Sequence, residues 1–271
     1  MFPFCLNTST IKTRPLPEKI ELTARAGYSC IELWCADVES YLGEGGSLPR
    51  LRAMLTNAGL QVPSMIALQG WGSLSGDTWR EFLKVARRRL ALAQALGCPK
   101  LVASPPREET SIEQLADHYG ELLEIGRSIG TLPAMEFLGF TAQVKDLRTV
   151  LEILARTNAR DATLVLDPFH VFRGGGSFAD VRMVPGHRIG ICHFNDAPQE
   201  PAREQQTDAH RVMPGDGTLP LVEMLQDIAA VGYTGPVSLE LFRPDLWERD
   251  PLAVAREGFH KMRQIVEQAG L

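Results

Sequence analysis

Four residues that could bind a metal ion each close a short apolar run. Glu136, Asp167, His193 and Glu240 end the runs Ala-Met-Glu, Leu-Val-Leu-Asp, Ile-Cys-His and Ser-Leu-Glu. Such runs form strands that are buried on both faces, and the chemistry of parallel barrels gathers where the strands end. Three carboxylates at one place repel one another unless a cation lies between them. The pattern predicts that these four residues bind one divalent metal ion, which could be Mn²⁺, Mg²⁺, Co²⁺ or Zn²⁺.

Three further side chains are placed to contact a substrate near this metal site. His170 follows Asp167 by three residues, where it could contact a substrate oxygen or orient a metal ligand. Arg211 precedes the turn sequence Pro-Gly-Asp-Gly, and its permanent positive charge can stabilise negative charge on a substrate. His210 could assist Arg211.

Three residues in the first third of the chain each have two interpretations. Glu32 lies inside an apolar run, either as inward-facing barrel structure or as a substrate contact. Trp34 and Trp71 could form pocket walls, because aromatic faces pack against the C–H surfaces of sugars, or they could belong to the core. We include Glu32 and Trp34 among the expected substrate-binding residues.

The chain repeats one unit eight times: a short apolar strand, a polar turn and an amphipathic helix. The expected strands cover residues 2–7, 30–34, 62–68, 100–104, 133–137, 164–166, 189–194 and 237–242. The expected helices cover residues 16–26, 48–58, 79–96, 111–129, 142–157, 178–183, 221–231 and 251–268. This alternation predicts an α/β fold with a single (β/α)8 TIM barrel over residues 1–271, since about 250 residues are typical of such a barrel. An open doubly wound sheet is the alternative, although no Gly-x-Gly-x-x-Gly follows the first strand.

Composition narrows the class of partner and compartment. The formal net charge of −5 argues against binding to nucleic acid or to an anionic membrane. The five cysteines are odd in number, form no Cys-x-x-Cys pair and lie mostly in apolar runs, as expected for reduced thiols in the cytoplasm. No apolar run is long enough to span a membrane, and no signal peptide opens the chain. We expect a cytoplasmic protein that acts on a small molecule, and a homo-oligomer stays open.

The motifs named above resemble the xylose isomerase-like TIM barrel superfamily of sugar and sugar-phosphate isomerases and epimerases. The resemblance rests on Glu-Phe-Leu-Gly at 136–139, Asp-Pro-Phe-His at 167–170, His-Phe-Asn-Asp at 193–196 and Glu-Leu-Phe-Arg-Pro at 240–244. It covers nearly the whole chain. Within the superfamily these sequences are most similar to the inosose isomerases of inositol catabolism.

The resemblance implies that the four strand-end residues bind the divalent ion and that His170 and Arg211 contact a keto-sugar or keto-inositol. It also implies that Glu136 and Glu240 exchange protons with carbons next to a ketone. This chemistry is coherent, because a metal ion stabilises an enediolate while two carboxylates serve as base and acid. We therefore expect an isomerase or epimerase, with 2-keto-myo-inositol as the specific candidate substrate.

Other activities could use the same residues. A dehydratase of the 3-dehydroshikimate or inosose type needs the same metal and base, so the sequence leaves it open. A keto-sugar 3-epimerase is less favoured, because residues 137–140 read Phe-Leu-Gly-Phe instead of the Pro-Leu-Asn-Arg-x-Glu that such epimerases resemble. DNA repair of the endonuclease IV type needs histidines on earlier strands, which 65–68 and 103–105 do not supply. A sugar sensor without catalysis predicts a broken ligand set, whereas all four ligands are present.

Overall fold

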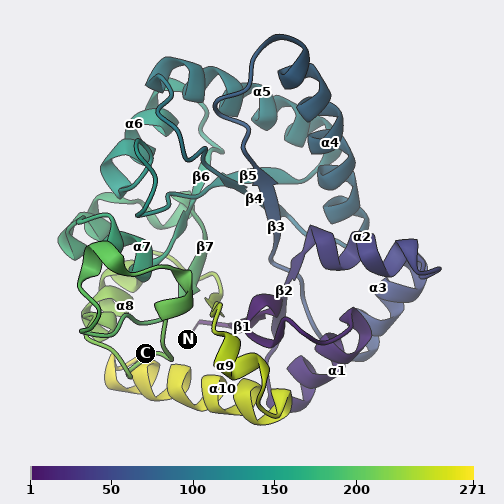
Figure 1. The fold of residues 1–271 in the computed structure, drawn as a ribbon, viewed down its shortest axis with the longest axis vertical. Helices are drawn as coiled ribbons and strands as arrows, with labels where there is room; N and C mark the ends of the chain where they lie inside the picture. Colours follow the sequence, from purple (N-terminus) through teal and green to yellow (C-terminus); the bar gives the residue numbers. More distant parts are fainter. Residues whose placement is uncertain (1) are drawn as a thin grey trace.

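The computed structural model describes residues 2–271, which form a closed barrel of eight parallel strands surrounded by helices (Figure 1). The strands follow one another around the barrel in chain order, and β1 pairs with β8 to close it. They are β1 (Phe4–Asn7), β2 (Cys30–Trp34), β3 (Ser64–Gln69), β4 (Lys100–Ser104), β5 (Leu132–Met135), β6 (Thr163–Leu166), β7 (Ile189–Phe194) and β8 (Val237–Leu239). The predicted (β/α)8 barrel is confirmed.

The strands are buried on both faces, as their apolar runs require. All four residues of β6 are buried, and the outward-facing side chains of the barrel pack against the helices. The inward-facing side chains form a second cluster, drawn from neighbouring strands, of Ile66, Ala67, Val102, Ala134, Val165 and Ile191. This apolar cluster fills the part of the barrel interior that β3 to β7 enclose.

The helices form a ring around the strands in Figure 1. They are α1 (Leu16–Ala26), α2 (Cys35–Gly43), α3 (Leu48–Asn57), α4 (Gly76–Ala95), α5 (Ile112–Ile129), α6 (Leu147–Arg156), α7 (Pro168–Arg173), α8 (Leu221–Ala230), α9 (Pro244–Trp247) and α10 (Pro251–Gln268). Their ends carry the expected signals. Ser111 caps α5 by accepting a hydrogen bond from the backbone N–H of Gln114, and Gly27 ends α1 with a φ of 101°.

Several boundaries differ from those expected. Helix α2 was not expected, because only Cys35 and Val38 in it are buried and its apolar periodicity is therefore weak. Helix α6 begins at Leu147, five residues later than expected, because Asp146 caps it by accepting from the backbone of Thr149. The segment Phe178–Met183 is a 3-10 helix.

The two chain ends lie near each other at the barrel end where the strands begin, since Phe2 and Leu271 line the same surface cavity. All five cysteines are buried free thiols. Among the helices of residues 2–271, none has the length and apolar character needed to cross a membrane.

Candidate metal centre

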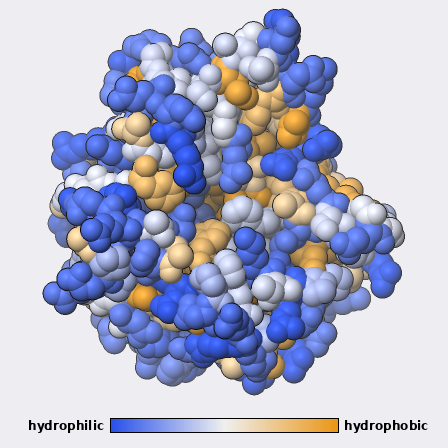
Figure 2. Space-filling view, in the orientation of Figure 1, coloured by the Kyte–Doolittle hydropathy of each residue, from blue (hydrophilic) through white to orange (hydrophobic). Residues whose placement is uncertain are grey.

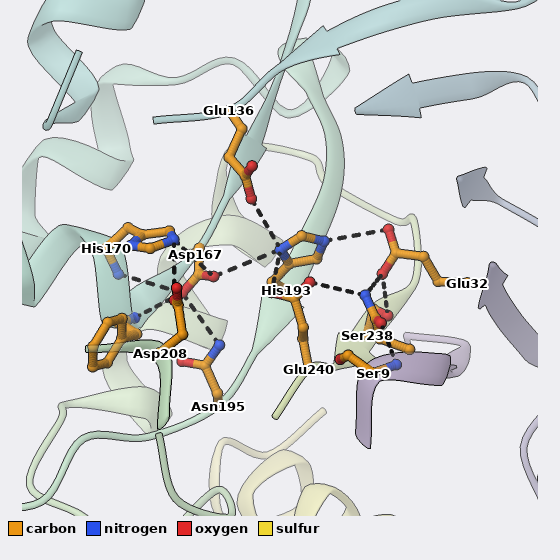
Figure 3. A network of polar contacts seen from close by, with 12 residues as sticks. Ser9, Glu32, Glu136, Asp167, His170, His193, Asn195, Asp208, Ser238 and Glu240 are labelled. Carbon is orange, nitrogen blue, oxygen red and sulfur yellow. Dashed lines mark hydrogen bonds and ion pairs between the residues drawn. The ribbon is translucent and has the colours of Figure 1, made fainter. Parts of the chain in front are cut away.

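The four predicted ligands meet at one mouth of the barrel (Figure 3). Glu136, Asp167 and Glu240 each stand one residue beyond the end of β5, β6 and β8, while His193 is the penultimate residue of β7. Their exposed fractions are 6%, 0%, 2% and 0%, so water contributes little to their solvation. The strand register brings three carboxylates that span 104 positions of the sequence, from Glu136 to Glu240, close to the imidazole of His193.

Nδ1 of His193 is the common point of the cluster. It lies 3.0 Å from Glu240 Oε2, 3.6 Å from Glu136 Oε1 and 3.6 Å from Asp167 Oδ2. Within residues 2–271, this buried nitrogen has no aligned hydrogen-bond partner. A buried polar atom without a partner is costly unless something else binds it.

The donor set fits a divalent metal ion. Glu136, His193 and Glu240 each offer one ligand atom, and these atoms all lie within 4.8 Å of one another. Carboxylate oxygens with one imidazole nitrogen suit Mn²⁺, Mg²⁺, Co²⁺ or Zn²⁺. Asp167 faces the same centre, but its Oδ2 lies 2.8 Å from Nη1 of Arg211 and so is shared with that cation.

Burial and mutual repulsion change the acidity of these ligands. Burial, with the charges of Glu240 and Asp167, raises the pKa of Glu136 to about 8 against the opposing charge of His193. Burial opposes a charged His193, but the charges of Glu240 and Glu32 outweigh it and raise the pKa of this imidazole. Without a metal, the cluster therefore retains protons near neutral pH.

Arg211 is the permanent cation of the site and is almost fully buried. Its Nη1 donates to Asp167 and to Glu240 Oε2, at 2.8 and 2.7 Å. On another edge of the guanidinium, Nε and Nη2 both donate to Oδ1 of Asp208. Burial opposes ionisation of Asp167, but Arg211 and His170 outweigh it and hold the pKa of this carboxyl below its usual range.

His170 stands in α7 at the side of the same cavity. Nη2 of Arg211 lies 2.9 Å from its Nε2, and the rings of Phe137, Phe140 and Phe169 meet it edge-on. Burial lowers the pKa of His170 to about 4, even though Asp167 acts in the opposite direction. His170 is therefore neutral at physiological pH.

A cavity of about 380 Å³ opens above the metal centre. Its lining includes Glu136, His170, Arg211 and Glu240, with Trp34 as part of the wall. Figure 2 shows a hollow near the centre of this face. Trp34 packs edge-on against Phe242, with ring centroids 5.8 Å apart. A cavity of this size suits a small molecule of the dimensions of a sugar.

Two predicted substrate contacts are placed elsewhere. Glu32 lies beneath the centre, 0% exposed, and its carboxylate is surrounded by protein donors instead of facing the cavity. His210 lies outside the cavity lining, and its Nδ1 accepts from the backbone of Thr207 within a short turn. Trp71 is fully buried in the main core.

Three residues that sequence reasoning missed complete the site. Asn7 donates to Glu240 Oε1 at 2.9 Å, and Ser104 donates to Glu136 Oε2 at 2.7 Å. Asp208 lines the cavity and pairs with Arg211 at 2.8 Å. Only the strand-end positions of Asn7 and Ser104 hinted at a role, because both close apolar runs as the metal ligands do.

The loop that carries Arg211 is fixed by one buried acid. The backbone of Asp196 pairs with that of Val212, and its side chain accepts from the backbone N–H groups of Gly215, Gly217 and Leu219. The Pro-Gly-Asp-Gly sequence forms the predicted turn around this carboxylate.

Comparison with known proteins gives relatives of several activities. The chain is 28% identical over 253 residues to the inosose isomerase of Halalkalibacterium halodurans, covering 90% of this chain and 89% of that protein. It is 26% identical over 263 residues to the 3-dehydroshikimate dehydratase of Pseudomonas putida. That match covers 94% of this chain but only 40% of the longer dehydratase.

Solved structures share the fold. A crystal structure of the IolI protein with a bound zinc atom superimposes with a TM-score of 0.92 at 24% identity, over 99% of both chains. An L-ribulose 3-epimerase superimposes with a TM-score of 0.80 at 18% identity, over 99% of this chain and 96% of that one. The family model described as xylose isomerase-like TIM barrel matches residues 20–265. This chain belongs to the xylose isomerase-like TIM barrel family.

Proposed function

We propose that this protein is a divalent-metal-dependent isomerase or epimerase of a keto-polyol or keto-sugar, with 2-keto-myo-inositol as the specific candidate. The observation that carries the proposal is the pair of carboxylates at the cavity floor. Glu136 and Glu240 each have one oxygen held by a buried donor and the other directed towards His193 Nδ1. The inosose isomerase relatives support the choice of substrate.

The same pair can move a proton along a substrate. A bound divalent ion would polarise a ketone and its neighbouring hydroxyl, and Glu136, His193, Glu240 and Asp167 would hold it. One carboxylate removes the proton from the hydroxyl-bearing carbon beside the ketone, the other delivers a proton to the former ketone carbon, and the hydroxyl proton passes to the former ketone oxygen. Burial strengthens these interactions, because water is excluded from the carboxylates.

Two further groups orient the substrate. Arg211 brings positive charge to the side of the cavity where negative charge develops on the ketone oxygen. Neutral His170 can exchange hydrogen bonds with hydroxyl groups, and the faces of Trp34 and Phe242 can pack against the C–H surface of a ring. The cavity therefore matches a polyhydroxylated ring in both polarity and size.

Dehydration is the second candidate, and the dehydratase relatives favour it. It begins with the same proton removal beside a ketone and then expels hydroxide. Arg107, at the cavity wall, would attract the carboxylate of a substrate such as 3-dehydroshikimate. A contact with Arg107 would therefore favour the negatively charged dehydratase substrate over the uncharged 2-keto-myo-inositol.

The test incubates metal-loaded protein separately with 2-keto-myo-inositol and 3-dehydroshikimate and identifies the products by NMR. We expect a new keto-inositol from the first substrate and no change in the second. Loss of water from either substrate would assign the dehydratase instead. Unchanged spectra for both, and for a panel of keto-sugars, would refute the proposal.

The compartment and partners follow from the same proposal. We infer a cytoplasmic enzyme, because its five buried thiols remain unbridged. The net charge of −5 argues against nucleic acid or an anionic membrane as a partner. A small-molecule substrate is its only proposed partner apart from copies of itself in a homo-oligomer.

A further inference from the structure

A buried polar layer lies beneath the metal centre, and Glu32 is its middle. Oε1 of Glu32 lies 3.2 Å from Nε2 of His193 and also accepts from the hydroxyl of Ser64. Oε2 accepts from Nδ2 of Asn7 and from the hydroxyl of Ser238, both at 2.8 Å. In Figure 3, Glu32 lies on one side of the His193 ring, and Glu136 and Asp167 lie on the other. All four contacts are made inside the protein, where unmatched donors are costly.

The orientation of the Asn7 amide is fixed by donors on its other side. Oδ1 of Asn7 accepts from Nε1 of Trp34 and from the backbone N–H of Ser9, both at 2.9 Å. Both of these groups can only donate, so the atom that faces them must be the amide oxygen. The amide nitrogen consequently faces Glu32 and Glu240 and donates one hydrogen to each.

The orientation of the Asn7 amide requires a hydrogen-bond acceptor on the side chain of residue 32. Its Oε2 position has to accept, because Asn7 donates there and cannot turn over. A carboxylate can accept at both ends, so Oε1 is also an acceptor for His193. When a metal ion is bound, the imidazole keeps a single proton, on Nε2, and Nδ1 gives its lone pair to the ion.

We propose that Glu32 is a positioning residue that fixes the Nε2 proton of His193 and thereby presents Nδ1 to Glu136 and Glu240 for metal binding. The proposal rests on the metal-dependent function proposed above. It assigns Glu32 no contact with substrate. Its role is transmitted through His193.

A single isosteric change separates this role from simple packing. In Glu32→Gln, the amide oxygen must occupy the Oε2 position, because Asn7 donates there. The new NH₂ group then faces Nε2 of His193 and can only donate to it. The ring must release its Nε2 proton and carry one on Nδ1, which removes the lone pair from the metal centre. Volume and shape stay nearly unchanged.

The experiment compares the wild type, Glu32→Gln and the matched control Ser64→Ala, which removes a donor from Oε1 but leaves the carboxylate. Zn²⁺ affinity is measured by competition with a chelating dye. The protonation of the imidazole nitrogens is read by ¹⁵N NMR of histidine-labelled protein, with His193 assigned from a His193→Gln variant. We expect Glu32→Gln to bind Zn²⁺ about 10- to 100-fold more weakly and to lose the Nε2 proton. Ser64→Ala should keep that proton and lose less affinity.

Each alternative outcome has a distinct meaning. Wild-type affinity in a folded Glu32→Gln variant, or retention of its Nε2 proton, would overturn the positioning role. If Glu32→Gln does not fold, the wild-type spectrum decides, because an Nε2 without a proton contradicts the proposal. If the wild type binds no metal, the metal-dependent function fails, and the NMR result in the metal-free protein still tests the role of Glu32.

Discussion

The two halves of the barrel mouth supply different kinds of group. The half built from β5 to β8 supplies Glu136, Asp167, His193 and Glu240, the groups that can bind a metal and move protons. The half built from β1 to β4 supplies donors and acceptors that hold those groups.

Three of the four predicted ligands contact a residue of the other half, whereas Asp167 is held by Arg211. Asn7 of β1 holds Glu240, Glu32 of β2 holds His193, and Ser104 of β4 holds Glu136. Each partner leaves one atom of its ligand directed towards the centre. A residue without reactive chemistry can therefore set which atom of a ligand is available.

The largest effect is expected in the reactive half. Glu240→Gln should lower the rate of proton exchange into substrate by about 10²- to 10⁴-fold, because it removes a proton-transfer group. The rate is measured by NMR in D₂O at saturating metal, with metal content determined for each sample. Glu248→Gln, at an exposed position, is the control. An exchange rate for Glu240→Gln within tenfold of wild type would show that chemistry does not depend on this carboxylate.

A smaller effect is expected in the supporting half. Asn7→Ala should lower kcat by about 10- to 100-fold, because Oε1 of Glu240 loses its donor and the indole of Trp34 loses its acceptor. Steady-state kinetics with separate kcat and KM values provide the measurement. If Asn7→Ala changed kcat as much as Glu240→Gln does, the proposed division between the two halves would be wrong.

Metal binding should strengthen as pH rises. The pKa of Glu136 is raised to about 8 and that of His193 is raised above its usual value, so both hold protons in the metal-free protein at pH 7. Ligation displaces these protons, so affinity should rise between pH 6 and 8 by about tenfold per pH unit for each proton released. Calorimetry with Mn²⁺ in two buffers of different ionisation enthalpy measures that release. Proton uptake, or no proton exchange with buffer at pH 7, would contradict the raised pKa values.

The smallest effect concerns the loop that carries Arg211. Asp196→Ala should lower the free energy of unfolding by about 1–3 kcal/mol, because it strands buried backbone N–H groups of that loop. Urea denaturation measures the change. Asp161→Ala, which breaks a half-exposed ion pair with Arg127, is the matched control and should cost about 0–1 kcal/mol. Equal losses would show that Asp196 contributes no more than a surface acid.

The barrel was predictable because its signal is local. Eight apolar runs alternate with helical segments. Strand β6 (Thr163–Leu166) is an example, because its short apolar sequence alone predicts a buried strand. The sequence did not predict helix α2, because this helix begins directly at the end of β2, has no side-chain cap and has few buried positions. Boundaries of this kind depend on packing that no short window of sequence records.

The supporting contacts were not predictable for a different reason. Asn7 and Glu240 are 233 residues apart, and no local sequence pattern predicts their hydrogen bond. Glu32 reads as a polar residue in an apolar run, which fits a substrate contact as well as a buried support. His210 lay beside Arg211 in sequence, but a tight turn directs it away from the cavity. Local chemistry was enough to predict the four candidate ligands, whereas the groups that hold them are evident only in the folded chain.

The central claim is that this metal centre moves a proton beside a ketone. Deuterium incorporation from D₂O into 2-keto-myo-inositol, followed by NMR for metal-loaded, chelator-treated and Glu240→Gln protein, tests it in one experiment. We expect label at the carbon beside the ketone only with the metal-loaded wild type. Equal incorporation after chelation, or none with metal bound, would contradict metal-dependent proton transfer at this site.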